Sequence, residues 1–145
     1  MKSDFYPKFL VFLQFALIGL MLLSMNAIPS VFAMLIFLLG ATIGIWALSH
    51  NQLGNFNIQP NIKEGCILIT SGIYKWVRHP MYSSVILMML GIFMATPSLV
   101  MFVLFILLIM VLLLKAKREE SLWLRHDTLY LTYREKTKYL IPYIL

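Results

Sequence analysis

Residues 83–114 read SSVILMMLGIFMATPSLVMFVLFILLIMVLLL, a stretch of 32 residues without a single charge. A helix needs about 20 apolar residues to cross a membrane, so this stretch is too long for one span and short for two. Pro97 lies near its middle between two small polar residues, a pattern that favours a break in a helix. We therefore expect two short helices joined by a tight turn, with the first starting near Pro80. One long helix kinked at Pro97 is the alternative, because membrane spans tolerate proline.

The composition also places the chain in a membrane. Of its 145 residues, 61% are hydrophobic and only 12% are charged, and the mean hydropathy is +0.85. A soluble protein this apolar would lack the polar surface needed to cover itself. Phe9–Met25 and Ile28–Leu48 are two further uncharged tracts. The sequence thus predicts an all-α integral membrane protein with four transmembrane helices, built as a single membrane-embedded domain over residues 1–145.

The placement of the basic residues gives a topology. All 12 Lys and Arg residues lie in the N-terminal segment, in the 49–82 loop or in the tail from Lys115 onward. Four spans place these three segments on one side, and basic residues in short loops favour the cytoplasmic side. We expect a multi-pass protein with both termini and the active site facing the cytosol. The net charge of +6 then needs no nucleic-acid partner, whereas contact with membrane lipids of negative charge fits it.

Two further patterns concern packing. Gly40-x-x-x-Gly44 in the second tract would let a neighbouring helix approach closely, and it favours packing within the chain over a dimer interface. The sequence otherwise leaves the oligomeric state open. Residues 115–136 alternate charged and apolar side chains in a helical rhythm. They predict a cytosolic continuation of the last helix and then an amphipathic stretch along the membrane, ended by Pro142.

Polar clusters flank the charge-free run on both sides. Arg78-His79-Pro80 precedes it and, considered alone, is explained as a basic flank where a helix begins. Its histidine adds a group that can donate, accept or titrate near neutral pH. Glu119-Glu120 follows the run and, considered alone, fits a solvated charge pattern with a Lys115–Glu119 pair at i,i+4. Two adjacent carboxylates just under the membrane would also suit a cationic small molecule.

Four tyrosines accompany these clusters: Tyr74, Tyr82, Tyr130 and Tyr133. An aromatic girdle at the membrane interface explains any one of them. Tyr130 and Tyr133 share a helix face at i,i+3, and aromatic faces attract cations. The three histidines of the chain are scattered and Cys66 is its one cysteine, so no metal site is expected.

The two clusters resemble a known family. LITSGIY at 68–74 followed by VRHPMY at 77–82 resembles the signature of the isoprenylcysteine carboxyl methyltransferases. Glu119-Glu120-x-x-Leu, Tyr130-x-x-Tyr133 and Ile141-Pro142 are similar to the same family's C-terminal pattern in order and approximate spacing. The related phospholipid N-methyltransferases share the membrane architecture and a paired-glutamate motif. Cys66, His126 and Lys136 depart from the family pattern.

The resemblance implies S-adenosylmethionine as the methyl donor, bound at the cytosolic ends of the last spans. The cofactor-binding residues that it implies are Gly72, Tyr74, His79, Tyr82, Glu119, Glu120, Tyr130 and Tyr133. Arg78 and Glu120 are the expected catalytic residues, with Arg78 positioning an acceptor carboxylate. Carboxylates and aromatic faces suit the cationic sulfonium and amino groups of this cofactor.

The expected acceptor is a lipid-like or prenylated small molecule, with carboxyl O-methylation of an isoprenylcysteine-like substrate favoured. A carboxylate is already nucleophilic, whereas an ammonium acceptor needs a general base such as a glutamate or His79. N-methylation of a phospholipid amine is therefore the alternative. An NADPH-dependent lipid reductase ranks lower, because the acidic pair Glu119-Glu120 does not suit a 2′-phosphate. A non-catalytic membrane adaptor would tolerate changes at His79 or Glu120.

Overall fold

The structure is a computed structural model that describes residues 5–51, 59–60 and 65–141. In these residues the chain is all-helical. Its elements are α1 (Phe5–Leu23), α2 (Val31–His50), the 3₁₀ turn η1 (Gly72–Lys75), α3 (Pro80–Ala95), α4 (Leu99–His126) and α5 (Leu129–Lys136). Helices α1, α2 and α4 are long and apolar enough to cross a membrane, and α3 is a shorter apolar helix. The predicted helical membrane fold is confirmed to that extent.

The long uncharged stretch forms a helical hairpin. Helix α3 ends at Ala95 and α4 begins at Leu99, so the two-helix prediction is correct and the kinked single helix is wrong. The Ser98 hydroxyl accepts a hydrogen bond from the Met101 N–H at 3.2 Å and caps α4. Pro80 occupies the first position of α3, where its missing N–H costs nothing.

The tail differs from the prediction in where its helices end. Helix α4 continues past the apolar run to His126, as expected, and α5 follows after a break at Asp127. The helix α5 ends at Lys136 rather than at Pro142, which lies outside the described residues. The reason is a competing set of backbone hydrogen bonds. Lys138 donates its N–H to the Trp76 carbonyl at 2.8 Å and forms a bridge with Val77, which diverts the chain from helical geometry.

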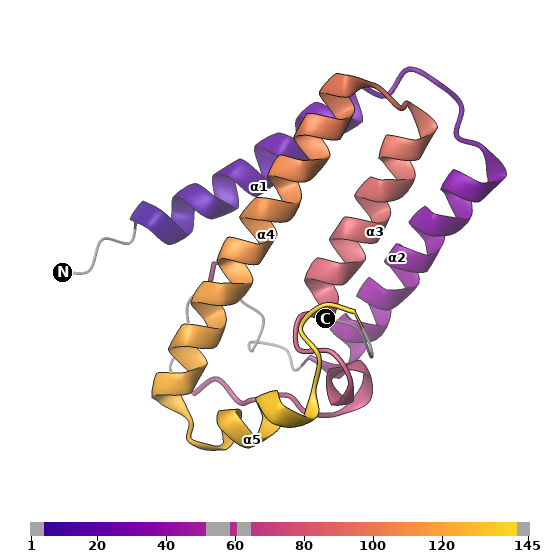
Figure 1. Ribbon diagram of the computed structural model, residues 1–145. Helices are drawn as coiled ribbons and strands as arrows, with labels where there is room; N and C mark the ends of the chain where they lie inside the picture. Colours follow the sequence, from indigo (N-terminus) through magenta and orange to yellow (C-terminus); the bar gives the residue numbers. More distant parts are fainter. Residues whose placement is uncertain (1–4, 52–58, 61–64, 142–145) are drawn as a thin grey trace.

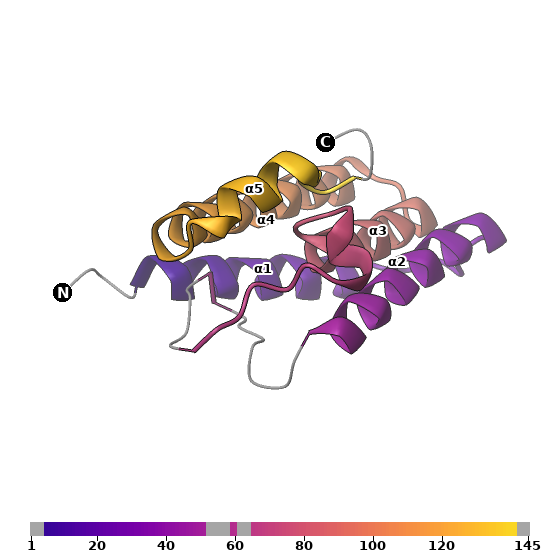
Figure 2. The ribbon, with the colours of Figure 1, turned by 90° about the horizontal axis from the view of Figure 1, so that it is seen from below.

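The helices are arranged in the spatial order α1, α4, α3, α2, and both the α1–α2 and the α3–α4 connections lie at the same end (Figure 1). Helix α5 and η1 lie together at the opposite end, as the view from below shows (Figure 2). Helix α3 packs mainly against α2, and α1 packs mainly against α4. The buried core between the helices consists of Leu10, Leu17, Met21, Met89, Met101, Phe105, Leu108, Val111 and Leu112.

Small residues bring α2 and α3 into close contact. A Cβ atom added at Gly40 would lie 2.7 Å from the Met88 backbone nitrogen, and one at Gly44 would lie 2.5 Å from the Ser84 hydroxyl oxygen. That hydroxyl donates to the Gly40 carbonyl at 2.7 Å. The expectation that this glycine pair packs within the chain is confirmed, and it fixes the position of α3, whose first residues enter the site described below.

We predict that Gly40→Ala destabilises the protein by about 1–3 kcal/mol, because the new methyl group meets α3 backbone that cannot move aside. Gly19→Ala in α1 is the matched control, since a Cβ there has no neighbour within 4 Å. The measurement is the unfolding free energy in mixed micelles. Equal stability of the two variants would show that the α2–α3 contact is looser than described.

Candidate active site

Gly72 begins the segment that leads into the site. Its φ of 59° lies in the left-handed region, which glycine adopts without strain. A Cβ atom at this position would collide with the His50 ring at the end of α2. Gly72 thus lets η1 turn tightly beside α2, and it does not itself line the cavity described below.

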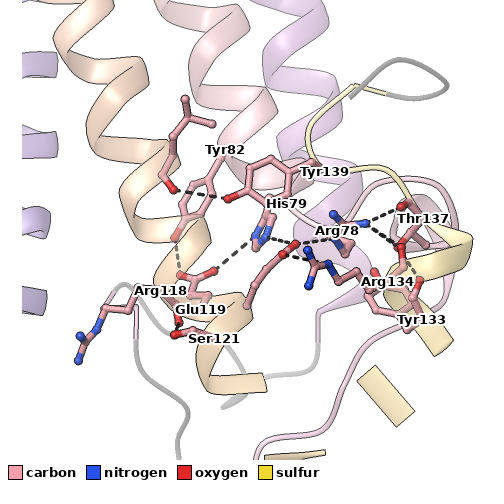
Figure 3. A network of polar contacts seen from close by, with 12 residues as sticks. Arg78, His79, Tyr82, Arg118, Glu119, Ser121, Tyr133, Arg134, Thr137 and Tyr139 are labelled. Atoms are coloured by element: carbon pink, nitrogen blue, oxygen red, sulfur yellow. Dashed lines mark hydrogen bonds and ion pairs between the residues drawn. The ribbon is translucent and has the colours of Figure 1, made fainter. Parts of the chain in front are cut away.

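The C-terminal tail closes over the start of α3. The Arg78 N–H donates to the Lys138 carbonyl at 2.8 Å, and the His79 N–H donates to the Tyr139 carbonyl at 3.2 Å. The Ser83 hydroxyl donates to the Leu140 carbonyl at 2.5 Å. These bonds tie the start of α3 to the tail, and the contacts of Glu119 and Glu120 with the same segment complete one network of polar contacts (Figure 3).

His79 lies at the centre of this network, between the two glutamates. Its Nδ1 is 3.5 Å from Glu119 Oε2, and its Nε2 is 3.5 Å from Glu120 Oε1. Its ring stacks on Tyr82 with the centroids 5.6 Å apart. Burial alone would lower the pKa of His79, but the two carboxylates outweigh it and raise the pKa above its ordinary value. The network therefore favours the imidazolium form.

Glu120 holds Arg78 in a buried ion pair. Arg78 Nε donates to Glu120 Oε1 at 2.6 Å, and Arg78 Nη1 donates to the carbonyls of Thr137 at 2.5 Å and Arg134 at 3.1 Å. Arg134 Nε lies 3.6 Å from the other oxygen of Glu120. The side chains of Arg78 and Glu120 are each only 9% exposed and are paired with each other, so Arg78 is not simply a basic helix flank and Glu120 is not a solvated acid.

Glu119 is held by a tyrosine rather than by a lysine. The Tyr82 hydroxyl donates to Glu119 Oε1. Lys115, expected to pair with Glu119, instead donates from Nζ to Gln14 Oε1 in α1 at 2.5 Å. Sequence reasoning missed Gln14, although an amide in the middle of an uncharged tract was a usable signal.

Aromatic rings form another wall. The Tyr133 hydroxyl donates to the Tyr74 carbonyl at 2.8 Å, and Trp123 stacks on Tyr130 with the centroids 6.1 Å apart. Burial, together with the charge of Glu119, raises the pKa of Tyr74 to about 12, so its phenol stays neutral. Trp123 also lines the cavity described below and is a site residue that sequence reasoning missed.

These groups surround a cavity of about 290 Å³, at the small end of the range for ligand pockets. Seven of the predicted site residues line it: Tyr74, Arg78, His79, Tyr82, Glu119, Tyr130 and Tyr133. Gly72 and Glu120 do not: Glu120 contacts the lining residues Arg78 and His79, whereas Gly72 packs against His50. A carboxylate beside several aromatic faces fits a cationic ligand such as a sulfonium. The donor set therefore fits S-adenosylmethionine.

We predict that the stability depends on pH through His79. Its folded pKa exceeds the unfolded value of about 6.5, so its stabilisation is complete below that pH and is lost as the pH rises through the folded pKa. The melting temperature in detergent should fall as the pH rises above about 6.5, and His79→Gln should flatten this fall.

The control for this prediction is His126→Gln, which changes an exposed histidine and should keep the wild-type profile. A wild-type slope that survives in His79→Gln would contradict the imidazolium assignment.

Comparison with known proteins identifies the family of the chain. A family model described as phospholipid methyltransferase matches residues 28–127, which contain α2, η1, α3 and α4. The match includes Arg78, His79 and both glutamates, whereas α1 and α5 lie outside it. A search of curated proteins gave no match. Because the matched region covers more than half of the chain, the protein belongs to the phospholipid methyltransferase family, the family of membrane isoprenylcysteine and phospholipid methyltransferases that its motifs resemble.

Proposed function

We propose that this protein is an S-adenosylmethionine-dependent methyltransferase that methylates a lipid-like acceptor in the membrane, with the carboxylate of an isoprenylcysteine-like molecule as the favoured acceptor. The observation that carries the proposal is the cavity, in which the Glu119 carboxylate and a set of aromatic rings meet where apolar helices give way to polar ends. Membership of a family of membrane methyltransferases supports the same chemistry.

The proposed topology has four spans, both termini in the cytosol and the site on the cytosolic side. At 1.5 Å per residue, the 16 residues of α3 cover about 24 Å, less than the hydrocarbon core of roughly 30 Å. With the other end of α3 at the opposite interface, its His79 end would therefore lie just inside the boundary of the hydrocarbon core. The turns at the far end carry no charge, while every basic residue lies outside them, which supports this orientation.

The cofactor would be bound by the anionic and aromatic part of the lining. Glu119 offers a carboxylate that Tyr82 and His79 hold in place, and Tyr74, Tyr130 and Tyr133 offer neutral aromatic surfaces. S-adenosylmethionine supplies a methyl group on a cationic sulfonium, and its transfer forms the bond from the methyl carbon to the acceptor as the C–S bond breaks. The chain has to align donor and acceptor and exclude water. In this proposal Glu120 acts by positioning His79 and Arg78.

Protonation of the site favours a carboxylate acceptor. A carboxylate needs no base, whereas an ammonium must lose a proton before it can attack. The two carboxylates raise the pKa of His79 and favour its imidazolium form, and Glu120 is engaged with Arg78, so both are less suited to accept a proton. Arg78 donates from Nε and Nη1 within the protein, which leaves the terminal Nη2 as the part available for the predicted positioning of a carboxylate.

N-methylation of a phospholipid amine is the second candidate. The observation that favours it is that Glu119 faces the cavity, where its carboxylate could take the proton of an ammonium group. The description of the matching family model points to the same acceptor class.

We predict saturable binding of S-adenosylmethionine to the purified protein in nanodiscs, measured by calorimetry, and no binding of NADPH. Glu119→Gln should weaken binding about tenfold or more, because interactions with a charged group contribute about 1.5–3 kcal/mol. Glu120→Gln should weaken binding and also lower the melting temperature, because it leaves Arg78 without its buried partner.

The matched control for this prediction is Glu135→Gln, an exposed glutamate on α5 that does not line the cavity. Wild-type affinity in Glu119→Gln would contradict the site assignment. Absence of binding by well-folded wild-type protein would favour the non-catalytic adaptor.

We also predict the chemical nature of the product. With tritiated methyl donor and S-farnesylcysteine as acceptor, the label should be released as methanol by mild base, because a methyl ester is hydrolysed and a methylamine is not. Phosphatidylethanolamine is the parallel acceptor. Base-stable label in that lipid, with none in S-farnesylcysteine, would contradict the proposed O-methylation and support N-methylation of a phospholipid amine.

A further inference from the structure

A buried lysine marks a part of the cavity that the proposed cofactor site does not use. Lys115 is the first charged residue after the 32-residue uncharged stretch, and it is only 2% exposed. Its Nζ donates to Gln14 Oε1, and both residues line the cavity. Gln14 is itself 7% exposed and lies within the apolar helix α1. An ionisable group at this depth is costly to desolvate, and in membrane proteins such groups commonly serve a ligand.

The polar network offsets the charge of Lys115 only in part, through the attraction of Glu119 one helical turn further along α4. Glu120 is paired with Arg78 and Arg134, and Glu119 is engaged by Tyr82 and His79. Among the ion pairs of the described residues, none includes Lys115.

The direct contacts of the ammonium group are with neutral groups. They are the Gln14 amide and the face of the Tyr82 ring, whose centroid is 5.3 Å away. An ammonium group carries three N–H donors, so donors remain for a ligand.

Lys115 lies in a different part of the cavity from the aromatic rings of α5. It lies one helical turn before Glu119, towards the α3–α4 connection, whereas Tyr130 and Tyr133 lie on α5 at the opposite end of the molecule (Figure 1). Apolar side chains of α1 and α3, Phe15 and Val85, line the same cavity. An amphiphile with its chain in the bilayer would thus reach Lys115 with its polar head.

We propose that Lys115, oriented by Gln14, binds an anionic oxygen group, a carboxylate or a phosphate, of the lipid-like methyl acceptor. This inference rests on the proposed function, since it assigns the second substrate of that site. Helix α1 lies outside the region matched by the family model, so Gln14 adds to the site a residue from beyond the matched segment. The acceptor's charge would offset the surplus positive charge that the fold buries.

The test uses full-length protein in an uncharged detergent, without S-adenosylmethionine, titrated with laurate, dodecyl phosphate or dodecanol. The readout is the fluorescence of Trp123, which lines the cavity, in a background with Trp46→Phe and Trp76→Phe, neither of which lines it. Both anions should bind roughly ten- to hundredfold more tightly than the alcohol, the range expected for hydrogen bonds to a charged group.

Lys115→Met should remove this preference for anions while leaving the affinity for dodecanol unchanged. Gln14→Leu keeps the charge and should retain most of the preference. Lys117→Met removes an exposed lysine two residues away and serves as the control. The double variant Gln14→Leu/Lys115→Met leaves neither polar group unpaired, so it gives the same test if the single variant does not fold.

Preference for laurate alone would identify a carboxylate as the ligand, and preference for dodecyl phosphate alone would identify a phosphate. Wild-type preference in both Lys115→Met and the double variant would overturn the inference. S-adenosylmethionine binding is measured separately on the same variants and should be unchanged. Its loss in Lys115→Met alone would assign Lys115 to the carboxylate of the cofactor and overturn the inference, whereas its absence in the wild type would overturn the proposed function.

Discussion

The buried ion pair between Arg78 and Glu120 is the contact on which the rest of the site depends. It joins residues 42 positions apart and ties the start of α3 to the polar half of α4. The same guanidinium holds the Thr137 carbonyl, so the C-terminal tail is fixed by the same group. A charge removed from water at this depth requires a partner and further hydrogen bonds. That requirement holds α3, α4 and the C-terminal tail together at this point. The resulting arrangement places His79 between the two glutamates.

The cavity beside this ion pair has two chemically different sides. Glu119 and the tyrosines give an anionic and aromatic side that suits a cation, whereas Lys115 and Gln14 give a cationic side nearer the apolar helices. The methyl transfer proposed above, from a cationic donor to an anionic acceptor, would bring opposite charges together and neutralise both. In a site with an anionic and a cationic side, each substrate can bind at the side of opposite charge while the two reacting atoms remain aligned.

Sequence reasoning succeeded where the signal was local. The break at Pro97 and the start of α3 at Pro80 follow from the covalent geometry of proline, and the close packing at Gly40 follows from the absence of a side chain. Sequence reasoning failed where a side chain had possible partners both on its own helix and on another helix. Lys115 was expected to pair with Glu119 along its own helix, but it turns to Gln14 in α1 instead. The end of α5 was also misplaced, because bonds to Trp76 override local propensity.

The sequence by itself determined the helical membrane class, the hairpin and the two motif clusters that identify the family. Only the tertiary structure decided that Glu119 faces the cavity and Glu120 the ion pair, and that Gly72 serves packing rather than the lining. Consecutive residues of a helix point about 100° apart, so the two glutamates reach His79 from different sides and differ in their other partners. Which neighbour each one meets depends on how α1, α3 and the tail pack around α4. Local sequence patterns do not carry that information.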